Sequence, residues 1–169
     1  LVRPLRLHVY CAEVRLISSL ASHGGISGAN EKGCVMILPV VAVALLREDG
    51  HILMQRRPEG KQHGGLWEFP GGKRESGESL VECLQRELFE ELLVRVGCPI
   101  LYQIIRHEYP EKIVELHFFR CVLEQGPPVP VDGQEIRWAS TNELHQFQFP
   151  PADQAIIDAL GREEGEVSP

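Results

Sequence analysis

Three glutamates crowd into one short stretch of the sequence: Glu87, Glu90 and Glu91. In an α-helix, positions i, i+3 and i+4 share one face, so these carboxylates would repel one another. Arg86 lies four residues before Glu90 and relieves only part of that repulsion. One explanation is an acidic, solvated helix face. The other is a hard divalent cation, because Mg²⁺ binds through a few carboxylates together with substrate phosphates. We favour a Mg²⁺ site, in which Mn²⁺ could substitute.

The residues before the three glutamates can extend such a site. Gly71 and Gly72 carry no Cβ, so the backbone can approach another group closely, and the Gly72 carbonyl can serve as a metal ligand. Lys73 and Arg74 follow directly and can reach a phosphate. Glu78 precedes the helix and faces this turn. The stretch therefore combines groups suited to a cation with groups suited to phosphate.

One helix must position these side chains. Ser79 and Glu82 form a capping-box pattern, which predicts the start of the helix. Apolar residues recur at helical spacing and predict its buried face: Leu80, Leu84, Leu88 and Leu92.

Strands are expected on both sides of this helix. Residues 37–49 predict a buried strand, Asp49-Gly50 predicts a hairpin turn, and residues 51–57 predict the returning strand. Further strands are predicted at 66–72, 100–109, 113–124 and 135–140, followed by short helices that begin near Ser140 and Pro151. The order of these elements indicates an α/β fold.

The composition excludes several classes of protein. With 169 residues, 43% of them hydrophobic, the chain can bury the core of one domain. A net charge of −7 argues against binding a nucleic-acid polymer but not against a single nucleotide. Five cysteines without C-x-x-C spacing indicate reduced thiols, and no apolar run is long enough to span a membrane. We expect a cytoplasmic protein without a membrane partner, and a monomer rather than a dimer.

The chain divides into three segments. Residues 1–35, of which residues 18–33 are polar and glycine-rich, contain three arginines and a single acid up to position 30. They are either a targeting segment or an extension upstream of a natural start at Met36. Residues 36–162 form the expected folded domain, and residues 163–169 a flexible tail.

The spacing of the glycine, glutamates and arginine resembles the Nudix box. Gly72 is followed after five residues by Glu78, and after seven more by "RELFEE" from Arg86 to Glu91. The Nudix family hydrolyses nucleoside diphosphates linked to another group, with an α/β/α sandwich around a mixed β-sheet. The resemblance implies that Glu87, Glu90 and Glu91 hold metal with Gly72. Leu93 replaces a family glycine that closes the helix, which implies a different or strained exit.

Beyond the box, the chain resembles MutT-type Nudix enzymes, which hydrolyse oxidised purine nucleoside triphosphates such as 8-oxo-dGTP. The matching stretches are "QRRPEGKQHGGLWEFPGGK", "YPEKIVELHFFRC", "VDGQEIRW" and "FQFPPAD". The resemblance implies that Arg57, Phe69 and Lys112 lie beside the nucleotide. It also implies that Asp132 supplies a further carboxylate to the metal, although these enzymes more often have Glu there. Glu135 is the alternative to Asp132.

Asp153 in the "FPPAD" stretch is a candidate for reading the base. The MutT type carries Asn or Asp in this element, and that side chain contacts the base edge. An ionised carboxylate only accepts hydrogen bonds. Oxidation at C8 turns guanine N7 into an N–H donor, so Asp153 could favour the damaged base. Alternatively, Asp153 only interacts favourably with the N-terminus of the helix that follows.

The resemblance implies hydrolysis of a nucleoside triphosphate to the monophosphate and pyrophosphate. Glu87 would orient or deprotonate the attacking water, and Glu90 would be needed for turnover. Glu78 and Arg86 would support the loop and the helix. Two alternatives stay open: a Nudix enzyme for CTP, dCTP or another nucleotide, and a Nudix module that only recognises an oxidised base. Such modules generally lack the metal carboxylates, which this chain retains.

Overall fold

The computed structural model describes residues 37–45, 50–110 and 112–165 of the chain. The predictions for residues 1–35 and for the last residues of the tail lie outside these ranges. The strands are β1 (Ile37–Leu45), β2 (Ile52–Arg56), β3 (Trp67–Glu68), β4 (Arg95–Glu108), β5 (Ile113–Gln125) and β6 (Ile136–Ala139). The helices are α1 (Leu80–Leu92), α2 (Gln154–Gly165) and the 3₁₀ helices Thr141–Gln146 and Pro151–Asp153. Helix α2 therefore extends beyond residue 162.

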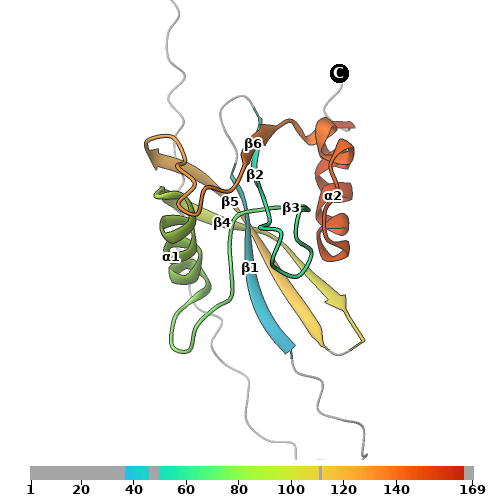
Figure 1. The fold of residues 1–169 in the computed structure, drawn as a ribbon, viewed down its shortest axis with the longest axis horizontal. Helices are drawn as coiled ribbons and strands as arrows, with labels where there is room; N and C mark the ends of the chain where they lie inside the picture. Colours follow the sequence, from blue (N-terminus) through green and yellow to red (C-terminus); the bar gives the residue numbers. More distant parts are fainter. Residues whose placement is uncertain (1–36, 46–49, 111, 166–169) are drawn as a thin grey trace, which may run out of the picture. The chain divides into compact units, whose positions relative to one another are not determined.

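The six strands form two three-stranded sheets between two helices. One sheet has the order β1-β5-β4, with β1 parallel and β4 antiparallel to β5. The other has the order β3-β2-β6 and is antiparallel. Helices α1 and α2 lie on opposite sides of the strands (Figure 1). This arrangement confirms the predicted α/β/α sandwich and its mixed strand directions.

The predicted hairpin between residues 37–49 and 51–57 is wrong. Strand β1 pairs in parallel with β5, Ile37 lying opposite Ile113, whereas β2 pairs with β3 and β6. Asp49 lies outside the described residues, and Gly50 has a positive φ of 79°, which suits a turn. The Asp-Gly signal reports only a local reversal of the chain. Pairing depends on distant strands, which that signal does not encode.

Two apolar clusters attach the helices to the strands. On the α1 side, Leu84, Leu88 and Leu92 are fully buried and belong to a cluster with Leu53 and Phe119. The predicted apolar stripe is thereby confirmed. In helices, such a stripe is buried against the neighbouring layer and supplies most of the stability.

The α2 side of the strands has a separate cluster. Ile156 and Ile157 of α2 belong to it together with Ile52 and Met54 of β2. Successive side chains of a strand point to opposite faces. Leu53 therefore faces α1, while its two neighbours face α2.

Helix α1 begins and ends as its sequence dictates. The Ser79 side chain accepts from the Glu82 N–H, and the Glu82 carboxylate accepts from the Ser79 N–H, which confirms the capping box. At the other end, Leu93 adopts the left-handed conformation, with φ of 54°, and its N–H donates to the Phe89 carbonyl. The sequence left two possibilities for the end of α1 at Leu93, a different geometry or a strained left-handed residue. The strained residue is the one present. Among the described residues, no helix is long and apolar enough to cross a membrane.

Candidate active site

Arg86 stands at the centre of the acidic face of α1. Its guanidinium pairs with the carboxylates of Glu78 at 2.8 Å, Glu87 at 3.0 Å and Glu90 at 3.2 Å. It also donates to the Lys73 carbonyl at 3.1 Å, which ties the loop before α1 to the helix. The hydrogen bonds from Arg86 lower the pKa of Glu78 to about 2. One positive group thus serves three carboxylates, and the face keeps an excess of negative charge.

Glu91 has a different environment from the other glutamates of α1. Its Oε2 accepts from Gln55 Nε2 at 2.9 Å and from the Gly71 N–H at 3.2 Å. Burial raises the pKa of Glu91 to about 7, while these two hydrogen bonds act in the opposite direction. A nearby positive charge would stabilise the ionised form of a buried carboxyl group such as Glu91.

Gly72 lies directly against the acidic face. A Cβ built on Gly72 would stand 2.2 Å from Cδ of Glu87, far inside van der Waals contact. The position therefore requires glycine as long as Glu87 keeps this place. The close approach expected of the Gly-Gly turn is present.

The donor set fits a hard divalent cation. Within the described part of the chain, no three Asp, Glu, His or Cys side chains converge into a preassembled metal cage. Arg86 instead lies among the carboxylates. The available donors are carboxylate and backbone oxygens, which Mg²⁺ prefers. The uncompensated negative charge around Arg86 favours a further cation.

A second polar group lies at the end of β2. Arg57 forms an ion pair with Glu68, whose backbone lies opposite Gln55 in the β2–β3 ladder. Asp153, only 7% exposed, interacts with both charges of that pair. Burial raises the pKa of Asp153 to about 7; the Glu68 charge adds to the rise, and Arg57 opposes it. Burial also raises the pKa of Glu68.

Comparison with known proteins identifies the family. A family model described as the NUDIX domain matches residues 41–159. The chain belongs to the Nudix family. The matched range includes the Gly-Gly turn, the acidic face of α1 and Asp153.

Individual Nudix relatives match most of the chain. An 8-oxo-dGTP diphosphatase of Haemophilus influenzae is 36% identical over 124 residues, covering 73% of this chain and 91% of the relative. A CTP pyrophosphohydrolase of Escherichia coli is 34% identical over 120 residues, covering 71% and 89%. The solution structure of the Escherichia coli ORF135 protein has 31% identity and a TM-score of 0.65, covering 79% of this chain and 94% of that one. The family and the fold predicted from the sequence are confirmed.

The structure gathers most of the residues that the Nudix resemblance singled out. Gly72, Glu78, Glu87 and Glu90 surround Arg86 or touch its partners. Glu91 stands beside them on α1 but bonds to β2 instead.

Other predicted residues lie apart from this group or are covered. Phe69 is buried and stacks on Phe149 with ring centroids 5.3 Å apart, so its side chain belongs to the core. Lys112 lies at the turn between β4 and β5, with its ammonium 5.6 Å from the Tyr109 ring. Glu135 pairs with the exposed Arg56. Asp132 is exposed, and its backbone N–H donates to the Gln134 side chain at 3.1 Å. The roles proposed for these residues stay predictions.

For Asp153, the structure adds that the carboxyl group need not be ionised. Its pKa of about 7 means that both protonation states are populated near neutral pH. A protonated carboxyl group can donate as well as accept a hydrogen bond. Preference for a damaged base through acceptance alone therefore requires the ionised form of Asp153.

Sequence reasoning missed two polar residues of the site, Gln55 and Glu68. Gln55 is 3% exposed and follows three buried apolar residues of β2. Strand alternation puts it on the same face as Leu53, toward α1. Glu68 lies opposite and shares that face. A polar side chain at an inward position of a strand was the available signal, but its partners are far away in the sequence.

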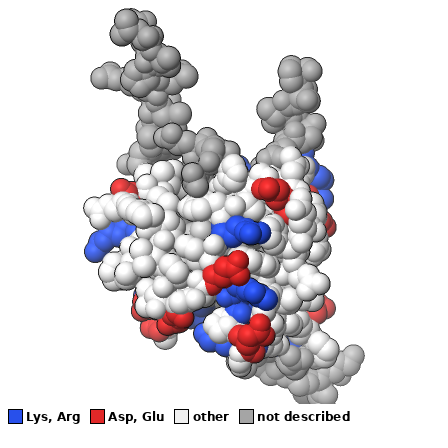
Figure 2. Space-filling view, turned by 45° about the horizontal axis from the view of Figure 1, so that its top comes forward, with Lys and Arg blue, Asp and Glu red and all other residues white. Residues whose placement is uncertain are grey.

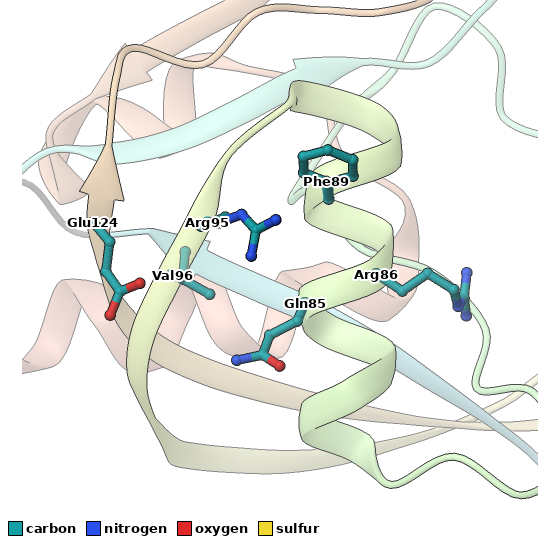
Figure 3. Close-up of a pocket in the computed structure, with 6 residues that line it drawn as sticks. All are labelled: Gln85, Arg86, Phe89, Arg95, Val96 and Glu124. Carbon is teal, nitrogen blue, oxygen red and sulfur yellow. The ribbon is translucent and has the colours of Figure 1, made fainter.

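The surface of the described residues carries charges of both signs (Figure 2). On the face shown in Figure 2, acidic and basic side chains of the described residues are interspersed. A cleft of about 280 Å³ lies between α1 and the strands β4 and β5, lined by Gln85, Arg86, Phe89, Arg95, Val96 and Glu124. Figure 3 shows Arg86 directed away from the other lining residues. Arg86 therefore borders both the cleft and the acidic face, with its guanidinium directed away from the cleft (Figure 3).

Proposed function

We propose that this Nudix chain hydrolyses nucleoside triphosphates, including oxidised purine nucleotides such as 8-oxo-dGTP, to the monophosphate and pyrophosphate. Removal of such nucleotides would sanitise the nucleotide pool and prevent mutation. The observation that supports this proposal is the acidic face of α1 together with a cluster formed by the partly buried Arg57 and Glu68 and the buried Asp153. The acidic face can bind a cation that carries the phosphates, and the polar cluster can form hydrogen bonds with the edge of a base. Relatives named 8-oxo-dGTP diphosphatase support the same activity.

The proposed metal ligands are the Gly72 carbonyl, Glu87, Glu90, Glu91 and Asp132. Bound Mg²⁺ would supply positive charge to the phosphate oxygens as negative charge develops on them. Asp132 is exposed in the loop before β6 and must move or act through water to contribute.

Side chains of the protein would position the water, the loop before α1, the phosphates and the base. Glu87 orients the attacking water and accepts its proton, while Arg86 and Glu78 keep the loop and α1 in register through their ion pair. Lys73 is exposed in that loop and reaches phosphate. At the other end, Asp153 contacts the base edge.

Three further residues are proposed to bind the nucleotide. Arg57 is held by Glu68 and presents its guanidinium beside the base. Lys112 reaches the nucleotide from the β4–β5 turn. Phe69, which is buried, shapes the floor of the site through its packing.

A second candidate is hydrolysis of CTP or dCTP. The CTP pyrophosphohydrolase relative is nearly as similar as the 8-oxo-dGTP diphosphatase relative. Asp153, when protonated, can donate a hydrogen bond that an ionised carboxylate cannot, so the site accommodates more than one base edge. A module that only binds an oxidised base is disfavoured because Glu87, Glu90 and Glu91 are all present.

Substitution of Glu90 tests the proposed function. Glu90→Gln keeps the shape of the side chain, and its carboxylate makes one exposed contact, with Arg86. We expect loss of turnover with Mg²⁺ and an unchanged melting temperature. Asp158→Asn is the matched control, because Asp158 is an exposed carboxylate on α2. Full turnover by Glu90→Gln would refute the role of the acidic face.

A further inference from the structure

Gln55 connects the two halves of the site. It lies on β2, almost completely buried, on the face of the strand that points toward α1. Its Nε2 donates to Glu91 Oε2 at 2.9 Å. Glu68, the partner of Arg57, lies directly opposite Gln55 in the β2–β3 ladder, and Gln55 acts to lower the pKa of the Glu68 carboxyl group. A buried amide thus joins a proposed metal ligand to the cluster proposed to bind the base.

The hydrogen bonds to Glu91 fix the orientation of its carboxylate. Both donors, Gln55 Nε2 and the Gly71 N–H, converge on the same oxygen, Oε2. Among the described residues, neither of these two donors reaches Oε1. Two bonds on one oxygen restrict rotation of the carboxylate and leave the other oxygen for a ligand.

A second amide supports Gln55. Gln134 Nε2 lies 3.3 Å from Gln55 Oε1 and 3.3 Å from the Glu91 carbonyl. Gln134 Oε1 accepts from the Asp132 N–H. The loop is anchored on α1 because the Val131 N–H donates to the same Glu91 carbonyl at 3.0 Å. Gln134 therefore fixes which way the Gln55 amide points, its oxygen toward Gln134 and its nitrogen toward Glu91.

We propose that Gln55 is a positioning residue, oriented by Gln134, that holds Glu91 in the geometry needed to bind the divalent cation. This inference rests on the proposed function, since it assigns Glu91 to the cation. Partners that orient metal ligands typically contribute 10–100-fold to metal affinity or activity. Gln55 is expected to contribute in that range, and Gln134 less, because it reaches the Glu91 carboxylate only through Gln55.

Binding of Mn²⁺ without nucleotide, followed by electron paramagnetic resonance, tests the proposal. Gln55→Met preserves side-chain length and removes the amide, and we expect about 10-fold or greater weakening of Mn²⁺ binding. The matched control is Gln154→Met, which removes an exposed amide that donates to Asp158 on α2. Circular dichroism melting checks that the variants are folded. Turnover should fall in kcat with a smaller change in KM for the nucleotide.

Gln134→Met provides a second variant should Gln55→Met fail to fold. We expect it to weaken Mn²⁺ binding several-fold and, in the double variant, to add less than its single effect, because the two amides act in series. Unchanged Mn²⁺ affinity in a folded Gln55→Met or, failing that, in Gln134→Met would overturn the inference while leaving the proposed function standing. A wild-type chain that binds no Mn²⁺ and turns over no nucleotide would overturn both.

Discussion

The buried carboxyl group of Asp153 should make the stability of this protein depend on pH. In the folded chain, burial and the neighbouring Glu68 raise the pKa of Asp153 from 3.8 to about 7. The folded chain therefore keeps a proton on Asp153 between about pH 4 and pH 7, where the unfolded chain has lost it. The contribution of Asp153 to the free energy of unfolding therefore falls as pH rises through this window.

The size of the effect follows from the difference in pKa. At about 1.4 kcal/mol per pKa unit, the ionised Asp153 costs about 4 kcal/mol above pH 7. Asp153→Asn removes the ionisation, although burying an amide donor without a partner costs about 1–3 kcal/mol. We expect the Asn variant to be more stable than wild type by about 1–3 kcal/mol at pH 8 and less stable at pH 4.

Urea unfolding monitored by tryptophan fluorescence at pH 4, 5, 6, 7 and 8 measures this dependence. The difference in unfolding free energy between Asp153→Asn and wild type should change by about 4 kcal/mol across the range. Asp158→Asn, which alters an exposed carboxylate on α2, should follow the wild-type curve. Parallel curves for wild type and Asp153→Asn would refute the reasoning, because they would mean that Asp153 ionises equally in the folded and unfolded chains.

Three further predictions concern positions with specific geometry. Gly72→Ala should lower kcat at least 10-fold with little change in far-ultraviolet circular dichroism, because a Cβ would overlap the Glu87 carboxylate; normal kcat would contradict the close approach. Leu93→Gly should be more stable toward urea than Leu93→Ala by about 1 kcal/mol, since only glycine adopts φ of 54° without strain; equal stability would show that Leu93 is unstrained. In the native protein at pH 8, iodoacetamide should modify the exposed Cys98 but not the buried Cys83, as mapped by mass spectrometry, because burial raises the pKa of Cys83 to about 12; rapid modification of Cys83 would contradict its burial.

Local patterns in the sequence were sufficient to predict α1 and its acidic face. The capping box at Ser79 and the spacing of Leu84 and Leu88 depend on residues within one or two helical turns. The cluster of Glu87 and Glu90 around Arg86 follows from the same periodicity, so both the helix and the position of its charges could be predicted.

Features that depend on distant residues could not be predicted in this way. The parallel pairing of β1 with β5 joins segments more than sixty residues apart, and the local Asp-Gly signal favoured a hairpin instead. The bond between Gln55 and Glu91 likewise depends on how β2 packs against α1. The protonation of Asp153 depends on burial, which no local pattern encodes.

The most direct test of the proposed function is turnover of the purified chain with Mg²⁺ against 8-oxo-dGTP, dGTP, dCTP and CTP. Products should be separated so that monophosphate with pyrophosphate is distinguished from diphosphate with phosphate. We predict Mg²⁺-dependent formation of monophosphate and pyrophosphate, with the highest kcat/KM for 8-oxo-dGTP, and no turnover after chelation by EDTA. Higher kcat/KM for CTP or dCTP would contradict the purine assignment, and no turnover of any of the four nucleotides would contradict the proposed enzyme itself.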